Sequence, residues 1–227
     1  MAIYAISDLH LSFGNNKPMD IFGANWENHY LKIAKDWNEK VKEEDLVILA
    51  GDFSWATYIS NTVEDFNFLN SLKGKKILLK GNHDYWWETV NKMKNFLKDN
   101  NFDNIEFLFN NCIEYNGISI CGTRGWARSN DPQYDNDKIF AREYLRLEYS
   151  LSQAKTEEKI VVLHFPPNEQ IVQIMERYNV KTCIYGHLHG NSSENVFDGA
   201  KKGNIDGIEY YLTSCDYLNF ELVKIEV

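Results

Sequence analysis

The chain has 227 residues, of which 44% are hydrophobic and 25% are charged, and its formal net charge at pH 7 is −9. These values are typical of a globular domain that buries a sizeable core. The negative charge argues against a broad nucleic-acid surface, because such surfaces usually carry an excess of Lys and Arg. It does not exclude small phosphorylated substrates, since a bound metal ion can outweigh the global field.

The first eight residues lead directly into a predicted strand, without the basic region and cleavage site of a secretory signal. No apolar run approaches the roughly 20 residues needed to span a bilayer. We therefore expect a cytoplasmic protein with no membrane partner, whose four cysteines are reduced. The sequence leaves the oligomeric state open.

Strand and helix patterns alternate along most of the chain, which predicts an α/β fold in a single domain over residues 1–227. Five apolar runs have the character of buried strands: Ala2–Ile6, Leu46–Ala50, Ile77–Leu79, Ile160–Leu163 and Thr182–Tyr185. Apolar residues at helical spacing predict helices over residues 25–42, 63–72, 86–97, 139–151 and 168–178. Aromatic and β-branched residues near the C-terminus predict two antiparallel strands, Ile208–Leu212 and Leu218–Val227.

Residues 113–120 predict a hairpin with a two-residue Asn-Gly turn. In this register Cys112 faces Cys121, with Cα atoms about 4.5 Å apart, at the short edge of disulfide reach. Because the expected compartment keeps thiols reduced, we expect two small apolar residues packed side by side. The cysteines lie away from the histidines and form no Cys-x-x-Cys pair, so a thiolate zinc site is not indicated.

A short polar cluster follows each of the five predicted strands. The clusters are Asp8-Leu9-His10, Gly51-Asp52, Gly81-Asn82-His83-Asp84, His164 and Gly186-His187-Leu188-His189. In open α/β sheets the ligand crevice lies outside the carboxyl ends of the strands. Residues two apart on an extended segment point to one face, so Asp8 and His10 can reach the same ion. One such cluster would be weak evidence, but five of them predict a metal centre.

These clusters, in this order, resemble the calcineurin-like metallophosphoesterases. The family pattern is Asp-x-His, Gly-Asp, Gly-Asn-His-Asp/Glu, a single His and Gly-His-x-His, and all five blocks occur between residues 8 and 189. The resemblance implies an α/β fold in which two sheets form a sandwich flanked by helices, with four layers in the order α/β/β/α. It also implies a centre of two divalent metal ions.

Carried over residue by residue, the resemblance implies two ligand sets that share one carboxylate. One ion would be held by Asp8, His10, Asp52 and His189. The second would be held by Asp52, Asn82, His164 and His187, with Asp52 bridging. Nitrogen-rich coordination without Cys suits Mn²⁺, Fe²⁺, Ni²⁺ or Zn²⁺ better than Mg²⁺ or Ca²⁺. Two such ions about 3.5–4 Å apart can clamp the attacking and leaving oxygens of a phosphate ester.

His83 and Asp84 are the predicted catalytic residues. In the family, the His at the position of His83 sits over the substrate and stabilises or protonates the leaving oxygen, a role that suits a side chain titrating near neutral pH. The chain departs from the calcineurin-type phosphatases at two positions. Trp55 stands where they carry an Asp that orients this His, and Tyr85 stands where they carry a phosphate-binding Arg.

Arg124 and Arg128 are candidates to replace that arginine, because a guanidinium group can clamp phosphate oxygens with two hydrogen bonds. They lie in a long polar loop, residues 122–138, of the kind that is often functional. Surface arginines paired with Asp131 or Asp135 are an equally consistent interpretation.

The sequence gives weaker evidence on whether the remaining histidine and the tryptophans belong to the site. His29 lies within the first predicted helix, on its polar side, and is expected to stay outside the site. Trp86 and Trp87 directly follow Asp84, so they are the tryptophans most expected to line the cleft.

The sequence thus predicts a dinuclear metal-dependent phosphohydrolase that cleaves phosphate mono- or diesters by attack of a metal-activated hydroxide. Its expected partner is a small phosphorylated substrate. A metal-dependent nuclease is the alternative, disfavoured by the acidic balance and the lack of a Lys/Arg run. An inert scaffold module is a third interpretation, disfavoured because every family ligand is present.

Overall fold

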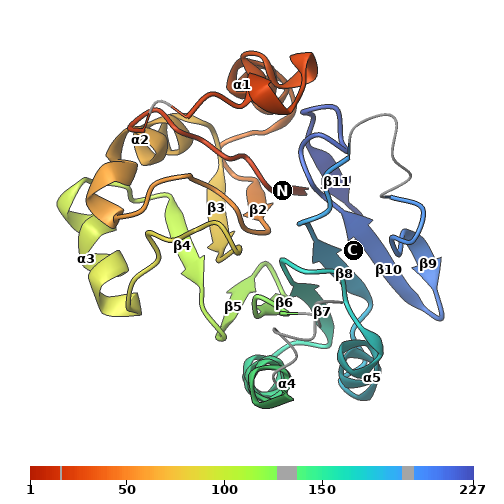
Figure 1. Ribbon diagram of the computed structural model, residues 1–227. Helices are drawn as coiled ribbons and strands as arrows, with labels where there is room; N and C mark the ends of the chain where they lie inside the picture. The colour runs from red at the N-terminus through yellow and green to blue at the C-terminus, as the bar shows by residue number, and fades with distance from the viewer. Residues whose placement is uncertain (16, 127–136, 191–196) are drawn as a thin grey trace.

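The computed structural model describes residues 1–15, 17–126, 137–190 and 197–227. Two β-sheets pack face to face, and helices cover the outer face of each (Figure 1). Helices α1, α2 and α3 lie against the first sheet, and α4 and α5 lie against the second (Figure 1). The predicted four-layer α/β/β/α sandwich is therefore confirmed.

The first sheet has the strand order β11-β1-β2-β3-β4. Its strands are β1 (Ile3–Ile6), β2 (Leu46–Leu49), β3 (Lys75–Leu79), β4 (Ile105–Leu108) and β11 (Val223–Ile225). Strands β1 to β4 run parallel to one another, and β11 pairs with β1 in the antiparallel sense. The carboxyl ends of the parallel strands consequently meet along one edge.

The second sheet has the order β5-β6-β7-β8-β10-β9. Its strands are β5 (Cys112–Tyr115), β6 (Ile118–Gly122), β7 (Glu158–Val162), β8 (Thr182–Tyr185), β9 (Gly203–Ile205) and β10 (Ile208–Leu212). The four inner strands are parallel, and the antiparallel hairpin partners β5 and β9 form the edges. This sheet also presents the carboxyl ends of its inner strands along one edge.

The strands read as unbroken apolar runs because both faces of each sheet are buried. In β2, Leu46 and Ile48 point into the layer between the two sheets, whereas Val47 and Leu49 point toward the helices. The layer between the sheets is almost wholly aliphatic, and the layer under α1–α3 holds most of the aromatic side chains. Strand alternation thus assigns the residues of one run to two separate cores.

The helices are α1 (His29–Lys40), α2 (Val63–Ser71), α3 (Val90–Asp99), α4 (Asp137–Ser152) and α5 (Glu169–Arg177). All five predicted helices are present. Helix α5 begins where Asn168 caps it, since the Asn168 side chain accepts a hydrogen bond of 3.0 Å from the backbone N–H of Ile171. Helix α3 begins at Val90 instead of residue 86, because the preceding segment turns around the carboxylate of Asp84.

The prediction for the C-terminal strands is partly wrong. Residues Ile208–Leu212 form β10, but its neighbours are β8 and β9. The predicted partner over 218–227 contributes only the three residues of β11, which pair with β1 in the other sheet. The pairing of β11 with β1 joins the two ends of the chain. The strand propensity of a segment does not indicate which distant strand it will pair with.

The predicted hairpin register is confirmed, because Cys112 is paired with Cys121 and Tyr115 with Ile118. All four cysteines are free thiols, so the pair packs without a disulfide. Within the described parts of the chain, no helix has the length and apolar character to cross a membrane.

Candidate metal centre

The carboxyl ends of the two sheets meet where the chain leaves β1 and β10. Ser7 and Ser214 form a parallel bridge there, with Ser7 N–H donating to the Thr213 carbonyl at 2.7 Å and Cys215 N–H donating to the Ser7 carbonyl at 3.0 Å. The segments after β1, β2 and β3 therefore face those after β7, β8 and β10. All seven predicted metal ligands lie on these segments.

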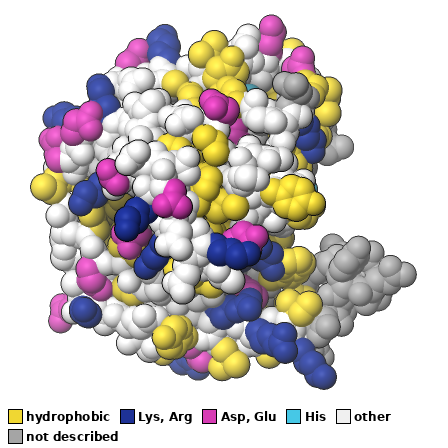
Figure 2. All heavy atoms as spheres, turned by 90° about the vertical axis from the view of Figure 1, so that its left-hand side faces the viewer, with side chains coloured by type: hydrophobic (Ala, Val, Ile, Leu, Met, Phe, Trp, Pro, Cys, Tyr) yellow, Lys and Arg dark blue, Asp and Glu magenta, His cyan; other side chains and the backbone are white. Residues whose placement is uncertain are grey.

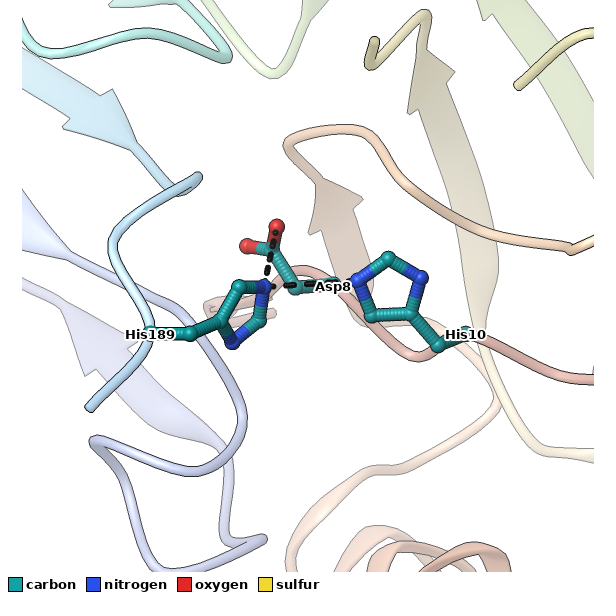
Figure 3. A group of neighbouring side chains, drawn as sticks. All are labelled: Asp8, His10 and His189. Carbon is teal, nitrogen blue, oxygen red and sulfur yellow. Dashed lines mark hydrogen bonds and ion pairs between the residues drawn. The ribbon is translucent and has the colours of Figure 1, made fainter. Parts of the chain in front are cut away.

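The first cluster consists of Asp8, His10 and His189, whose donor atoms all lie within 4.8 Å of one another. Figure 3 shows the His189 ring pointing from the loop after β8 toward the Asp8 carboxylate and the His10 ring, both of which follow β1. His189 Nε2 lies 3.2 Å from Asp8 Oδ1 and 3.3 Å from His10 Nε2. Two sheets thus supply donors to one point.

The second cluster surrounds Asn82. Its side-chain Oδ1 lies 2.7 Å from Nε2 of His164 and 2.9 Å from Nδ1 of His187. Asp52 lies between the two clusters: its Oδ2 is 3.5 Å from His164 Nε2 and 3.7 Å from His10 Nε2. The structure therefore brings the seven residues close together, and Asp8, Asp52 and His164 also form a group whose donor atoms lie within 4.8 Å of one another. The division of the seven into two ligand sets bridged by Asp52 stays a prediction.

The backbone of this region is strained in a way that aims the side chains. Asp8, His10, Asp52 and His187 all have positive φ, of 60°, 47°, 53° and 72° respectively. Non-glycine residues rarely adopt this left-handed conformation, and such strain persists mainly at functional sites.

Two glycines of the motifs allow the close approach of the carboxylates. A Cβ at Gly81 would lie 2.0 Å from Asp52 Oδ1, and one at Gly186 would lie 2.3 Å from Asp8 Oδ2. Any other residue at either position would push the carboxylate away from the centre. The glycines of the Gly-Asn-His-Asp and Gly-His-x-His blocks are thus needed for packing against the ligands.

The environment of His164 fits a cation. Its Nδ1 lies 2.9 Å from the Ala50 carbonyl oxygen, so Nδ1 carries the ring proton and donates it. Burial lowers the pKa of His164 to about 4, which leaves the ring neutral with a lone pair on Nε2. This lone pair faces two oxygen acceptors, on Asn82 and Asp52. A metal ion at their common point would turn three repelling acceptors into three ligands.

The environment of Asp52 gives a second, independent indication that this site binds a cation. Its Oδ1 accepts a hydrogen bond of 2.7 Å from the backbone N–H of His83, but its Oδ2 is buried and has no hydrogen-bond partner among the described residues. Burial and the nearby carboxylates of Asp8 and Asp84 raise the pKa of Asp52 well above its usual range. A divalent cation between Asp8 and Asp52 would supply the charge that keeps both ionised.

Asp216 orients His189 and was missed by the sequence analysis. His189 Nδ1 donates to Asp216 Oδ1 at 2.9 Å, and the backbone N–H of Gly190 donates to Asp216 Oδ2 at 3.1 Å. Although burial opposes it, the charges of Asp8 and Asp216 raise the pKa of His189 to about 10. A carboxylate behind a ligand imidazole is the usual second partner at metal sites. The only sequence signal was the polar Ser-Cys-Asp triplet after β10.

Asp84 has a different role from the catalytic one predicted. It is fully buried, and its carboxylate accepts hydrogen bonds from the backbone N–H groups of Asp52, Phe53 and Gly81 at 2.7–2.9 Å. It also accepts one of 3.0 Å from the Trp86 indole. With both oxygens occupied, Asp84 ties the loop after β2 to the loop after β3. It is a positioning residue, and the expectation that it acts on substrate is corrected.

His83 lies at the rim of the centre, next to Trp55. The ring centroids of His83 and Trp55 are 4.6 Å apart, and Trp55 also stacks on His10 at 4.6 Å. Nδ1 of His83 is buried, with no hydrogen-bond partner among the described residues. Burial, Lys17 and His189 lower the pKa of His83. An indole therefore occupies the place of the orienting carboxylate.

The expectations for three other side chains were wrong. Trp86 and Trp87 pack in the core under α3, and the cleft is lined instead by Trp26 and Trp55. His29 is buried, and its Nε2 contacts the Leu9 carbonyl oxygen at 2.8 Å, so it lies on the core side of α1 and not on its polar side. Helical spacing alone did not distinguish a core histidine from a solvated one.

Arg124 lies on the second-sheet side. Its carbonyl oxygen accepts hydrogen bonds from the backbone N–H groups of His164 and Phe165 at 3.0 and 3.1 Å, which fixes its backbone beside a ligand. Its guanidinium carbon lies 4.0 Å from the Trp126 ring centroid, and the side chain lines a cavity of ≈ 210 Å³ together with Lys80. Arg128 lies outside the described residues. Substrate binding by these arginines stays a prediction.

Comparison with known proteins agrees with this geometry. A family model described as calcineurin-like phosphoesterase matches residues 1–191. The chain belongs to the calcineurin-like phosphoesterase family. The resemblance expected from the sequence is thereby confirmed, and the ligand clusters after β1, β2, β3, β7 and β8 all fall within the matched segment. The family binds divalent metals and acts on phosphate esters in general.

Comparisons with individual proteins are less informative about function than the family match. An uncharacterised protein of Methanocaldococcus jannaschii is 30% identical over 91 residues, covering 38% of this chain and 48% of the relative, so the match spans about half of that protein. A protein of unknown function from Aquifex aeolicus has a TM-score of 0.53 at 23% identity, covering 98% of this chain and 95% of that one. The phosphopantetheinyl hydrolase of Mycobacterium tuberculosis has a TM-score of 0.57 at 15% identity, covering 99% and 95%. At these identities the structural likeness shows the fold alone.

Proposed function

We propose that this protein is a dinuclear metal-dependent phosphohydrolase that cleaves phosphate mono- or diesters and uses Mn²⁺, Fe²⁺, Ni²⁺ or Zn²⁺. The proposal rests on Oδ2 of Asp52, which is buried, has no hydrogen-bond partner among the described residues, and lies 3.5 Å from His164 Nε2 and 3.7 Å from His10 Nε2. A carboxylate oxygen in that position can serve ions on both sides. We further propose that residues 1–227 act as one domain, because both sheets contribute ligands.

In the proposed arrangement, Asp52 belongs to both ligand sets. The first set is completed by Asp8, His10 and His189, and the second by Asn82, His164 and His187. When bound, a pair of divalent ions supplies Lewis-acid polarisation of the phosphoryl group and neutralises charge on its oxygens. The protein contributes fixed donors: the hydrogen bonds to Ala50 and Asp216 set which ring nitrogens of His164 and His189 face the centre.

His83 is the proposed general acid or hydrogen-bond donor to the leaving oxygen. It lines the cavity beside His10 and His189, so an ester held at the ligands would extend past its ring. Its lowered pKa favours the neutral imidazole, which still carries one N–H. We therefore propose that His83 stabilises the leaving oxygen by a hydrogen bond from this N–H, and that it protonates this oxygen only from the imidazolium form.

We propose small phosphate esters rather than nucleic acid as substrates. The net charge of −9 gives no general attraction for a polyanion. On the face drawn in Figure 2, Lys and Arg side chains lie among Asp and Glu, so their fields largely cancel at a distance. The favourable charge would instead be local, at the bound ions.

The test combines metal content with activity. Protein saturated with Mn²⁺ should hold two ions per chain by elemental analysis, and it should hydrolyse members of a panel of phosphomonoesters, phosphodiesters, nucleotides and single-stranded DNA. A matched control is His29→Gln, which removes a buried histidine outside the ligand sets and should keep both ions. At most one ion at saturation, or no hydrolysis of any ester by protein with two ions, would refute the proposal.

A further inference from the structure

A cavity of ≈ 340 Å³ opens beside the first ligand cluster. One wall is made of imidazoles, from His10, His83 and His189. The rest of the lining is mainly apolar and comes mostly from the loop between β1 and α1; its apolar side chains are Met19, Ile21, Phe22, Trp26 and Trp55. The cavity therefore joins the proposed catalytic centre to an apolar surface without a break.

The charge of this cavity differs from that of the centre. Among its described lining residues there is no Lys or Arg, and the one carboxylate, Asp216, is engaged by His189 and by the backbone N–H of Gly190. The His189 ring is paired with the carboxylates of Asp8 and Asp216, and Lys17, outside the lining, is held over the Trp55 ring at 3.0 Å from its centroid. A second charged group in the cavity would therefore lose hydration without meeting an unpaired ionic side chain among the lining residues. The lining thus selects for an uncharged occupant.

The loop presents apolar side chains that the protein itself does not cover. In the short 3₁₀ turn Asp20–Phe22, Ile21 is 67% exposed and Phe22 is 46% exposed, although both line the cavity. Met19 and Trp26 on either side are buried, so the turn is anchored at both ends. Met19 also accepts a hydrogen bond from the Trp55 indole at 3.0 Å, which ties the loop to the wall of the site.

From these observations we propose that the cavity holds the alcohol part of the substrate and that the preferred substrate is a phosphate ester of an apolar, uncharged alcohol. The inference rests on the proposed phosphohydrolase function. His83, the proposed hydrogen-bond donor to the leaving oxygen, lines this cavity, so an alcohol group attached to that oxygen would enter it. The apolar group then covers Ile21 and Phe22, which makes burial of the alcohol the source of selectivity.

A homologous series tests the selectivity. With Mn²⁺-loaded protein, kcat/KM should rise about fourfold for each methylene added from ethyl to hexyl phosphate, until the cavity is filled. Each ester is matched with its ω-hydroxyalkyl counterpart, whose leaving group is similar and whose far end is polar. The alkyl member should exceed its partner by roughly tenfold. Equal values along the series, or a preference for the polar partners, would overturn the inference while leaving phosphohydrolase activity in place.

Loop variants locate the effect. Phe22→Ser and Ile21→Ser should each reduce the ratio of hexyl to hydroxyhexyl phosphate turnover about threefold to tenfold, with metal content unchanged. The matched control is Leu31→Ser, since Leu31 is 55% exposed on α1 and does not line the cavity. A ratio unchanged in both loop variants, or equally changed in the control, would assign the selectivity elsewhere.

Binding without turnover separates this inference from the proposed function. Hexylphosphonate and hydroxyhexylphosphonate have a C–P bond in place of the ester linkage and are therefore not hydrolysed. Their binding can be followed by tryptophan fluorescence, because Trp26 and Trp55 line the cavity. The apolar phosphonate should bind roughly tenfold more tightly, and Phe22→Ser should remove most of the difference. Equal affinities would refute the apolar subsite even if no ester were hydrolysed.

Discussion

The two halves of the proposed metal centre are built differently, although both lie at strand ends. The first sheet supplies both carboxylates, Asp8 and Asp52, on segments with left-handed backbone conformation. The second sheet supplies three imidazoles, from His164, His187 and His189, and no carboxylate ligand. The two proposed carboxylate ligands thus lie on one side of the centre, and three of the four proposed imidazole ligands lie on the other.

The halves also differ in how their side chains are held, and each depends on its partner. His164 donates to the Ala50 carbonyl of the first sheet, and the Asp8 carboxylate accepts from the backbone N–H of His187 of the second at 3.0 Å. Asp52, by contrast, is held within its own half by His83 N–H and by the loops that Asp84 ties together. Asp52 and His189 are therefore held by contacts within their own halves, whereas His164 and the Asp8 carboxylate are oriented by contacts between the two sheets.

The largest effect should come from the junction of the halves. Asp52→Asn removes the charge that both ions would share, so kcat/KM should fall roughly 10⁴-fold, and binding of both ions should weaken. His10→Ala should cost clearly less, because His10 serves one ion. The measurement is kcat/KM with elemental analysis at Mn²⁺ saturation. Similar residual activities in the two variants would mean that Asp52 does not bridge.

A smaller loss should follow from His83→Ala, which lies in the first half but is not a proposed ligand. The rate should fall about 10²–10³-fold with both ions retained. The loss should shrink for nitrophenyl esters, whose leaving group needs little protonation. Loss of metal in parallel with activity would instead make His83 a ligand.

In the second half, Asp216→Ala should weaken metal binding by roughly 10–100-fold, because His189 loses the carboxylate that orients it. The control is Asp198→Ala, at an exposed position away from the ligands. Isothermal titration with Mn²⁺ measures both. An unchanged affinity in Asp216→Ala would show that His189 is oriented without Asp216.

Metal binding should also depend on pH through His189. Its pKa is raised to about 10, so the metal-free protein keeps a proton on this ring between pH 6.5 and 10. An ion that takes Nε2 must displace this proton, so the apparent affinity should rise about tenfold per pH unit in that window. Because the pKa of His189 is higher in the folded protein than in the unfolded chain, its protonation stabilises the metal-free fold. This stabilisation is fully present below pH 6.5 and is lost as the pH rises toward 10. A flat affinity from pH 7 to 9 would contradict it.

The smallest effect is expected at the outer edge of the second half. Arg124→Lys should lower kcat/KM about tenfold with metal content intact, since a point charge cannot replace two hydrogen bonds from a planar guanidinium. Arg142→Lys, on the exposed face of α4, is the control. If Arg124 and Arg128 variants both turn over substrate like the parent protein, phosphate recognition does not involve this loop.

Much of the fold and of the proposed ligand set could be predicted from short sequence patterns. Apolar runs of three to five residues gave β1, β2, β3, β7 and β8, and the polar clusters after them contain all seven predicted ligands, which the structure brings together. Strand β4 (Ile105–Leu108) was not among the predicted strands, since the Phe109-Asn110-Asn111 segment after it carries no Asp or His like those that follow the predicted strands. Helix α3 was predicted to start too early, because the hydrogen bonds to Asp84 compete with helix formation in the residues before Val90.

The order of the strands and of the predicted ligands is encoded locally, since each predicted ligand lies within a few residues of the end of its strand. The residues that contact and orient these ligands were revealed by the packing of the fold. Asp216 reaches His189 because β10 lies beside β8, and Trp55 and Phe22 reach the same cavity from separate loops. Asp84 became a positioning residue because four N–H groups from two loops converge on it. Such roles depend on distances between segments far apart in the chain, which packing of the two sheets sets and local composition does not encode.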